Sequence, residues 1–338
     1  MALLYTRRNF IKTSAVAGVG IGLAGSVHPL FGKELSLQGK RIGIIGLDTS
    51  HSIEFTRVFN QQNASPDYDG YKIVAAYPKG SLDIASSVKR IPDHIEKVKG
   101  MGVEIVDSID DLLKKVDVIL LETNDGRRHL EQAIPVLQSG KREFIDKPMS
   151  ASLADGIAIF EAARHFNTPV FSASSLRYIS SAQDIVKGRI GKVLGADAYS
   201  PCVLEKTHPD FFWYGIHGVE LLYTVMGTGC RDVVRVHSEN PDIAIGRWAD
   251  GRTGTFRGTR TGKHLYGGTA FGETGNAVLG PIEGYEPLLK EIVKFFNTGI
   301  PPVKAEDTLE ILAFMEAADA SKRKKGAAVS LETVWKKA

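Results

Sequence analysis

The strongest constraint on the fold is a repeat between residues 39 and 175, in which short apolar runs alternate with longer amphipathic segments. Buried strands are expected at residues 41–47, 72–77, 103–106, 116–121, 144–145 and 170–173. Helices are expected at 53–62, 82–99 with a break at Pro92, 109–115, 129–139 and 154–166. This β-α alternation predicts a doubly wound parallel sheet with right-handed crossovers. The chain of 338 residues is long enough for about two domains, and residues 36–175 are predicted to form the first.

The pattern changes after residue 175. Strands are expected at residues 193–203, 233–238, 243–248, 254–259 and 277–279, with helices at 180–189 and 217–226. Strands clustered in this way predict an open, mainly antiparallel sheet in a second α/β domain over residues 176–338. Closing helices at 284–297 and 307–323 are candidates to pack back on the first domain.

Residues 1–35 resemble a twin-arginine export signal and leader. Arg7 and Arg8 precede a weakly apolar, glycine-rich run from residue 13 to 27, and cleavage is expected between residues 24 and 33. A membrane helix is the alternative, but the run is short and holds four glycines. The prediction is an exported, periplasmic protein with no stable membrane span after processing.

Charge and cysteine content exclude several classes of protein. The formal net charge of +3 equals the three bases of the first 32 residues, which hold no acid, so the rest of the chain is neutral and no nucleic-acid partner is expected. Cys202 and Cys230 are expected to be buried thiols, with one disulfide as the alternative. Neither has a Cys or His neighbour at metal-ligand spacing, and no metal site is predicted.

The first strand-turn-helix carries a damaged dinucleotide fingerprint. Gly46 aligns with the first glycine of Gly-x-Gly-x-x-Gly, but Asp48 and His51 stand at the second and third. A carboxylate about 4 Å from a phosphate costs about 4 kcal/mol at an effective dielectric of 20. Either Asp48 turns away or the diphosphate sits differently, and Asp48, Thr49 or Ser50 could instead cap the helix.

The second strand ends at Tyr77 without the acid that would bind an adenosine ribose hydroxyl. Lys79 and Ser81 could face a 2′-phosphate or be ordinary turn residues. The choice between NAD and NADP therefore stays open.

Several segments together resemble the Gfo/Idh/MocA oxidoreductase family over nearly the whole chain after the leader. They are residues 123–129 with Glu131, residues 140–141, Asp146-Lys147-Pro148, Arg177, residues 215–217 and residues 326–331. The family's usual Glu-Lys-Pro is here Asp-Lys-Pro. The resemblance implies a Rossmann domain, an α/β domain whose open sheet supports the active site or a homo-oligomer interface, and NAD(P)-dependent chemistry on a carbinol of a sugar or cyclitol.

The resemblance assigns catalysis to Lys147, which would polarise the reacting oxygen, and His217, which would move its proton. Lys147 follows a buried strand, at the edge where α/β sheets bind ligands. His217 begins a helix, and imidazole suits proton transfer near neutral pH. The alternatives without a catalytic role are a solvated loop lysine and a histidine of the core.

The remaining predicted contacts surround this pair. Cofactor contacts are predicted at Gly46, Asp48, Thr49, Ser50, His51, Tyr77, Lys79, Ser81, Thr123, Asn124, His129, Asp146 and Lys147. Substrate contacts are predicted at Arg177, Tyr178, Asp210, Trp213, Tyr214 and Glu220. Trp213 stands where many relatives carry an acid, and the aromatic run around it could hold a sugar ring or be core. Arg177 could equally form an exposed interdomain salt bridge.

The sequence therefore predicts an NAD(P)-dependent oxidoreductase acting on a CH-OH group of a carbohydrate, with the cofactor retained through the cycle. Two alternatives remain. One is a redox-neutral lyase, hydrolase or epimerase that oxidises its sugar transiently. The other is a non-catalytic sugar-binding protein of the same fold.

Overall fold

The computed structural model describes residues 39–338. The predicted signal peptide over residues 1–35, with its Arg7-Arg8 motif, lies outside the described residues. Within the described part of the chain, every helix is too short or too polar to cross a membrane.

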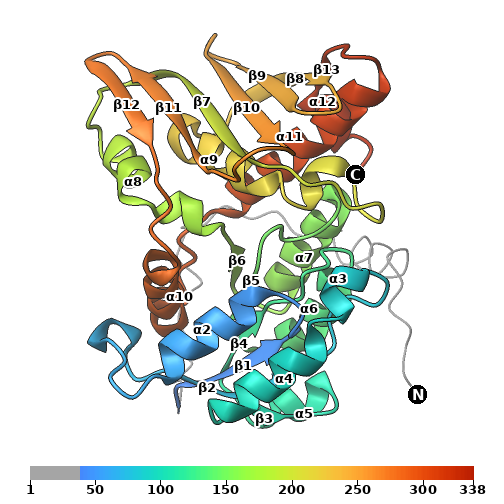
Figure 1. The fold of residues 1–338 in the computed structure, drawn as a ribbon, viewed down its shortest axis with the longest axis vertical. Helices are drawn as coiled ribbons and strands as arrows, with labels where there is room; N and C mark the ends of the chain where they lie inside the picture. The colour runs from blue at the N-terminus through green and yellow to red at the C-terminus, as the bar shows by residue number, and fades with distance from the viewer. Residues whose placement is uncertain (1–38) are drawn as a thin grey trace, which may run out of the picture. The chain divides into compact units, whose positions relative to one another are not determined.

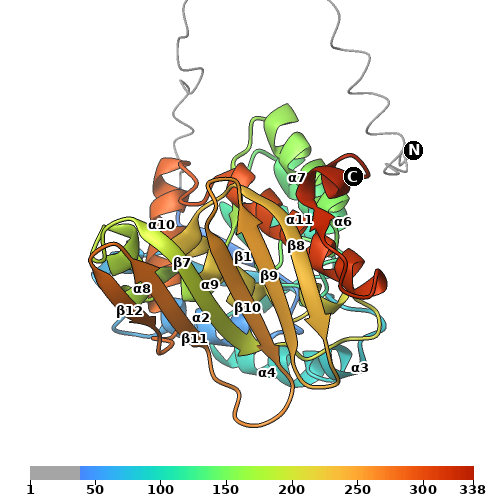
Figure 2. The same ribbon diagram turned by 90° about the horizontal axis from the view of Figure 1, so that it is seen from above.

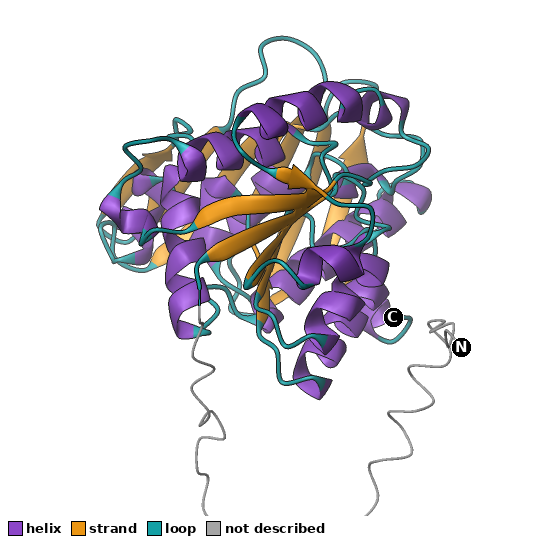
Figure 3. Cartoon of the chain, turned by 90° about the horizontal axis from the view of Figure 1, so that it is seen from below, coloured by secondary structure: helices purple, strands orange, loops and turns teal. Residues whose placement is uncertain are grey.

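The first sheet is a six-stranded parallel sheet with strand order β3-β2-β1-β4-β5-β6. Its strands are β1 (Arg41–Ile45), β2 (Lys72–Tyr77), β3 (Glu104–Ile105), β4 (Val118–Leu121), β5 (Glu143–Ile145) and β6 (Val170–Ser172). The central strands are buried on both faces, as expected for a parallel sheet covered by helices on both sides (Figures 1 and 3). The strand order reverses between β1 and β4, and this switch point is where such sheets bind ligands.

The connecting segments are short helices with identifiable starts. They are η1 (Pro66–Tyr68), α2 (Ser50–Asn60), α3 (Ala85–Val88), α4 (Ile91–Gly100), α5 (Ile109–Leu113), α6 (His129–Gln138) and α7 (Leu153–His165). Thr49 caps α2, because its hydroxyl accepts the backbone N–H of His51. The expected break near Pro92 falls between α3 and α4, and Pro92 lies in the first turn of α4, where a missing N–H costs no helical bond.

The second sheet has seven strands in the order β12-β11-β7-β10-β9-β8-β13, and only the β7–β10 pair is parallel. The strands are β7 (Val193–Pro201), β8 (Cys230–His237), β9 (Asp242–Trp248), β10 (Thr253–Thr259), β11 (Gly267–Gly272), β12 (Gly275–Leu279) and β13 (Val329–Ser330). The sequence pattern missed β11, whose three glycines lower its strand propensity. Gly268 is needed there, because a Cβ would lie 2.1 Å from the carbonyl oxygen of Asp197.

Helices cover one face of this sheet and leave the other open (Figure 2). The second half contains η2 (Ser175–Tyr178), α8 (Ser180–Val186), η3 (Asp210–Phe212), α9 (Ile216–Met226), α10 (Glu286–Thr298), α11 (Ala305–Arg323) and α12 (Leu331–Trp335). The α9 and α11 helices pack on the sheet around Phe256 and Trp248. Cys202 and Cys230 are both buried and free, so the thiol expectation is confirmed.

The α10 and α11 helices also join the two sheets. Phe295 of α10 meets Phe171 of β6 edge-on, with ring centroids 4.9 Å apart. Glu316 of α11 accepts the backbone N–H of Leu153 at the start of α7, at 2.7 Å. These contacts fix the edge of the first sheet against the second.

Candidate active site

A cavity of about 400 Å³ lies at the carboxyl ends of the first sheet's strands and extends to the second sheet. Both predicted catalytic residues line it. The full lining is Thr49, Ser50, His51, Ser86, Arg90, Asn124, Lys147, Ser175, Pro201, Val203, Trp213, Tyr214, His217, His264, Tyr266, Ile282 and Tyr285.

Lys147 reaches this cavity from the loop after β5. Its side chain is 10% exposed, and Nζ lies 3.4 Å from Oδ2 of Asp146. Burial alone would raise the pKa of Asp146, but the charges of His51 and Lys147 hold it well below its usual range. An ionised Asp146 thus accompanies a cation that the cavity exposes to a ligand.

His217 stands in the first turn of α9. Its Nδ1 lies 2.9 Å from the hydroxyl oxygen of Ser174. Burial lowers the pKa of His217 well below its usual value, and the nearby charges of Lys147 and His51 lower it further. The ring is therefore neutral near pH 7 and suited to accept a proton.

A buried network holds His217 in place. Glu220 accepts the backbone N–H of Ser174 at 2.8 Å and the Nε–H of Arg177 at 2.7 Å. Glu220 is 3% exposed and does not line the cavity, although the sequence predicted a substrate contact. The exposed interdomain salt bridge considered for Arg177 is not what the structure shows, because Arg177 pairs with Glu220 of the same domain and its side chain is only 12% exposed. Its role here is to position Ser174 and, through it, His217.

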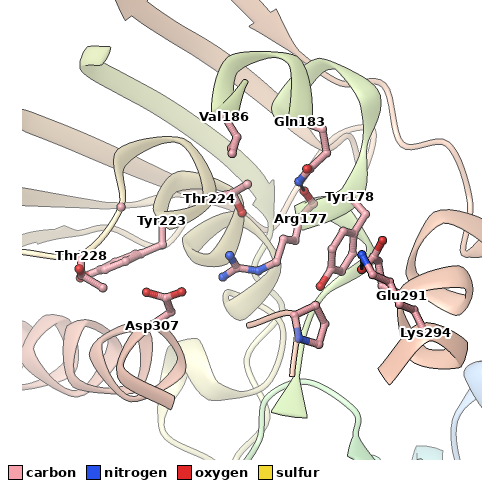
Figure 4. A pocket seen from close by; sticks show the side chains of 12 residues that line it. Arg177, Tyr178, Gln183, Val186, Tyr223, Thr224, Thr228, Glu291, Lys294 and Asp307 are labelled. Carbon is pink, nitrogen blue, oxygen red and sulfur yellow. Dashed lines mark hydrogen bonds and ion pairs between the residues drawn. The ribbon is translucent and has the colours of Figure 1, made fainter. Parts of the chain in front are cut away.

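Arg177 and Tyr178 line a different cavity of about 450 Å³ beside α8, α9 and α10 (Figure 4). Their predicted contact with a substrate in the Lys147 cavity is therefore not supported by their position. The reason is that both residues belong to the 3-10 turn η2, which packs against α9.

The predicted aromatic surface divides into two parts. Trp213 and Tyr214 line the cavity, whereas Phe211 and Phe212 are fully buried in the core of the second sheet. Asp210, a predicted substrate contact, instead accepts hydrogen bonds from Arg235 and Lys322 and lies outside the cavity. Its position anchors η3, directly before the two aromatic residues that face the cavity.

The start of the fingerprint keeps its glycine for a steric reason. Gly46 has φ +90°, and a Cβ there would lie 2.6 Å from the backbone nitrogen of Thr123. Asp48 turns away from the helix start, so this one of the two alternatives holds. Its carboxylate accepts the backbone N–H groups of Ser81 and Asn124, at 2.8 and 3.0 Å, and the hydroxyl of Ser81.

The cavity walls fit a dinucleotide diphosphate. Thr49 and Ser50, at the start of α2, line it together with Asn124 and the cations of Arg90 and Lys147. Of the described residues that line the cavity, none is acidic. A helix N-terminus together with cations in the cavity wall favours an anion, and the ionised Asp146 lies beside Lys147 without lining the cavity.

The other predicted cofactor residues do not line the cavity, and His129 and Ser81 instead contact the loops that form it. The ring of His129 meets the carbonyl oxygens of Met149 and Thr123, at 3.0 and 2.6 Å. The Ser81 hydroxyl is engaged by Asp48, which removes it as a free phosphate contact. Tyr77 ends β2 and Lys79 is exposed just beyond it.

Replacement of Asp48 by alanine is expected to lower the free energy of unfolding by about 1–3 kcal/mol, because two buried backbone N–H groups lose their acceptor. Urea unfolding followed by circular dichroism measures this. Asp93→Ala is the control, since that carboxylate is exposed. Tighter nicotinamide binding by Asp48→Gly would instead mean that the carboxylate faces the diphosphate.

Sequence reasoning missed the residues that reach the cavity from loops. Arg90 comes from the turn before α4, and Tyr285 from the residue before α10. His264 and Tyr266 belong to the β10–β11 connection, which the sequence pattern did not define because β11 was not predicted. The one signal in the sequence that could have indicated Arg90 was a basic residue in the connection after β2, where no ribose-binding acid occurs.

Comparisons with known proteins agree with this geometry. Residues 40–173 match the model of the GFO_IDH_MocA oxidoreductase family, NAD-binding Rossmann fold. A comparison with curated proteins finds no significant match.

Solved structures with a similar fold include three dehydrogenases. The scyllo-inositol dehydrogenase from Lactobacillus casei, with bound NAD(H) and scyllo-inositol, is 17% identical with a TM-score of 0.69, and the match covers 86% of this chain and 99% of that one. The myo-inositol 2-dehydrogenase from Lactobacillus plantarum is 18% identical, with a TM-score of 0.68 and coverage of 86% and 98%. The WlbA dehydrogenase from Bordetella pertussis, in complex with NADH and UDP-GlcNAcA, is 18% identical, with a TM-score of 0.67 and coverage of 86% and 97%. The described chain thus has the two-part α/β fold of these dehydrogenases, and residues 40–173 match the NAD-binding domain of the Gfo/Idh/MocA oxidoreductase family.

Proposed function

We propose that this protein is an oxidoreductase that transfers hydride between NAD or NADP and a carbinol carbon of a sugar or sugar derivative. One observation carries the proposal: Lys147 and His217 line the same cavity as the N-terminus of α2, whose helix dipole favours an anion. The site thus joins a place for a diphosphate to a place for proton transfer.

Each residue has a defined part in this reaction. Lys147 donates a hydrogen bond to the substrate oxygen and stabilises the negative charge that develops on it. Neutral His217, held by Ser174, takes the hydroxyl proton in the oxidative direction and returns it in the reductive one. Bound nicotinamide supplies the hydride acceptor or donor. Trp213 and Tyr214 offer apolar surface to the C–H face of a sugar ring.

The proposed location is the periplasm, reached through the twin-arginine route on the basis of Arg7 and Arg8. A nicotinamide released there would have no recycled pool to return to. The cofactor is therefore proposed to be loaded before export and retained. Each oxidation must then be matched by a reduction on the same bound cofactor, which favours sugar-sugar oxidoreduction or a redox-neutral conversion.

Protein purified without added nucleotide is expected to release NAD(H) or NADP(H) when denatured, and to convert substrate without free cofactor. Chromatography of the denatured supernatant measures the nucleotide, and product analysis shows whether net oxidation occurs. A redox-neutral product would favour a lyase, hydrolase or epimerase. Protein that emerges empty and binds nicotinamide no better than about 1 mM, or roughly −4 kcal/mol, would favour a non-catalytic sugar-binding protein.

The open face of the second sheet supports a proposed homo-oligomer (Figure 2). Val236 and Val278 are 55% and 73% exposed, and Tyr199 and Phe271 are partly exposed on neighbouring strands. Apolar side chains gathered on one sheet face are typical of an interaction surface.

A further inference from the structure

Three ionisable side chains from separate elements meet at the switch point of the first sheet. His51 comes from the first turn of α2, Glu122 follows β4, and Asp146 follows β5. Nδ1 of His51 lies 2.8 Å from Oδ2 of Asp146 and 3.9 Å from Oε2 of Glu122. One donor atom from each residue lies within 4.8 Å of the other two.

These groups are buried without enough partners. Glu122 is 0% exposed and Asp146 1%. Nδ1 of His51 is paired with Oδ2 of Asp146, but among residues 39–338 neither oxygen of Glu122 nor Oδ1 of Asp146 has a hydrogen-bond partner. A buried polar group that is left without a partner destabilises the fold. Side chains that fold together at this cost indicate a ligand that satisfies them jointly.

We infer that His51, Glu122 and Asp146 bind one divalent transition-metal ion of the Zn²⁺ or Mn²⁺ type. One imidazole with two carboxylates is a donor set that such ions accept. The two carboxylates balance the charge of the ion, so the occupied cluster carries no net charge beside Lys147. The inference does not rest on the proposed function.

The surroundings hold the imidazole in place for this role. The His51 ring stacks on Phe55, with centroids 5.4 Å apart, and meets the edge of Tyr285 at 4.7 Å. Three protein ligands leave a coordination position for an outside oxygen. His51 and Lys147 both line the cavity, so that position is available to water or to a hydroxyl of the substrate.

The experiment measures metal binding alone, without nicotinamide or sugar. The chelator-treated full-length protein is titrated with ZnCl₂ and MnCl₂ by calorimetry, and bound metal is counted by mass spectrometry after desalting. One ion per chain is expected. Glu122→Gln and His51→Asn should each weaken binding at least a hundredfold.

Glu143→Gln is the matched control. Glu143 lies on the neighbouring β5 strand and is also fully buried with both oxygens unpartnered, but it does not belong to the cluster. Its replacement should leave metal affinity unchanged. Equal losses in Glu143→Gln and Glu122→Gln would overturn the inference, because they would reflect a general effect on folding.

The rival explanation is a neutral Glu122 without metal. Burial, and then the charge of Asp146, raise the pKa of Glu122 well above its usual range. Glutamine mimics a protonated glutamate, so Glu122→Gln would then fold normally while the wild-type protein shows no saturable binding up to about 1 mM. That result overturns the inference. Should the variants fail to fold, the visible spectrum of Co²⁺ added to wild-type protein decides, since bands unchanged from free Co²⁺ would exclude a site.

Discussion

Replacement of Lys147 by alanine is expected to lower the catalytic rate by about two to four orders of magnitude, and His217→Ala to do the same. The two residues face one cavity, one from the end of the first sheet and the other from the start of α9. Removal of Lys147 takes away the cation that stabilises the developing oxyanion. Removal of His217 takes away the proton acceptor, while the Ser174–Glu220–Arg177 network remains intact.

The measurement is single-turnover oxidation or reduction of nicotinamide by sugars and cyclitols, followed by absorbance. Lys141→Ala is the matched control, because Lys141 precedes the same strand at its opposite end and should leave the rate unchanged. Circular dichroism and nicotinamide release confirm that the variants fold and bind. A fully active Lys147→Ala enzyme would contradict the assignment.

The first half of the fold follows closely from the sequence, because each buried parallel strand is a continuous apolar run between amphipathic helices. The predicted strand at residues 72–77 matches β2, and the strand predicted at 116–121 contains β4. The conformation that brings Lys147 to the ligand-binding edge also follows from this alternation. In the second half, β11 was not predicted, because close contact with its neighbouring strands requires glycines and glycines give no apolar pattern.

The candidate site was only partly predictable, because side-chain partners come from distant parts of the chain. Asp210 is polar and adjacent to aromatic residues, but its partners Arg235 and Lys322 are 25 and 112 residues away. Glu220 shares a helix face with His217, yet Arg177 engages it. Periodicity assigns a residue to a face, whereas charge pairing across the fold decides whether it meets a ligand.

A second large effect is expected from the Arg235 cluster, which supports the cavity from outside. Arg235 on β8 is 1% exposed, and its guanidinium pairs with Asp210 and Asp242, at 2.7 and 2.9 Å, and with Asp319. It also lies over the ring of Phe211, 4.1 Å from the centroid. Arg235→Met is expected to lower the free energy of unfolding by about 3–5 kcal/mol, because buried carboxylates lose their common cation.

Arg247→Met provides the control for that measurement by urea unfolding. Arg247 on the neighbouring β9 strand pairs with Asp232, but its side chain is 59% exposed, so its loss should cost about 0–1 kcal/mol. Equal destabilisation by both substitutions would show that the buried cluster contributes no more to the free energy of unfolding than an exposed ion pair does.

The gain in stability as pH falls from about 8 to 5 should be larger in Arg235→Met than in the wild type. In the wild type, burial would raise the pKa of Asp242, but Arg235 and Arg260 lower it to about 2, so its contribution is present above the ordinary 3.8 and is lost as pH falls toward 2. Burial raises the pKa of Asp319 to about 7 despite Arg235. Without that cation both carboxylates favour protonation, so the variant should recover stability relative to wild type as pH falls from about 8 to 5.

The same substitution also tests how the cluster serves the active site. Arg235 anchors Asp210 in η3, three residues before Trp213 in the cavity wall. At pH 5, where the variant regains part of its stability, KM for the sugar should still be raised, because Asp210 has lost one of its two cations. The single-turnover rate at saturating sugar should stay near that of wild type, since Lys147 and His217 are held by other elements. A fall in rate with unchanged KM would place the effect on His217 instead of on the aromatic wall.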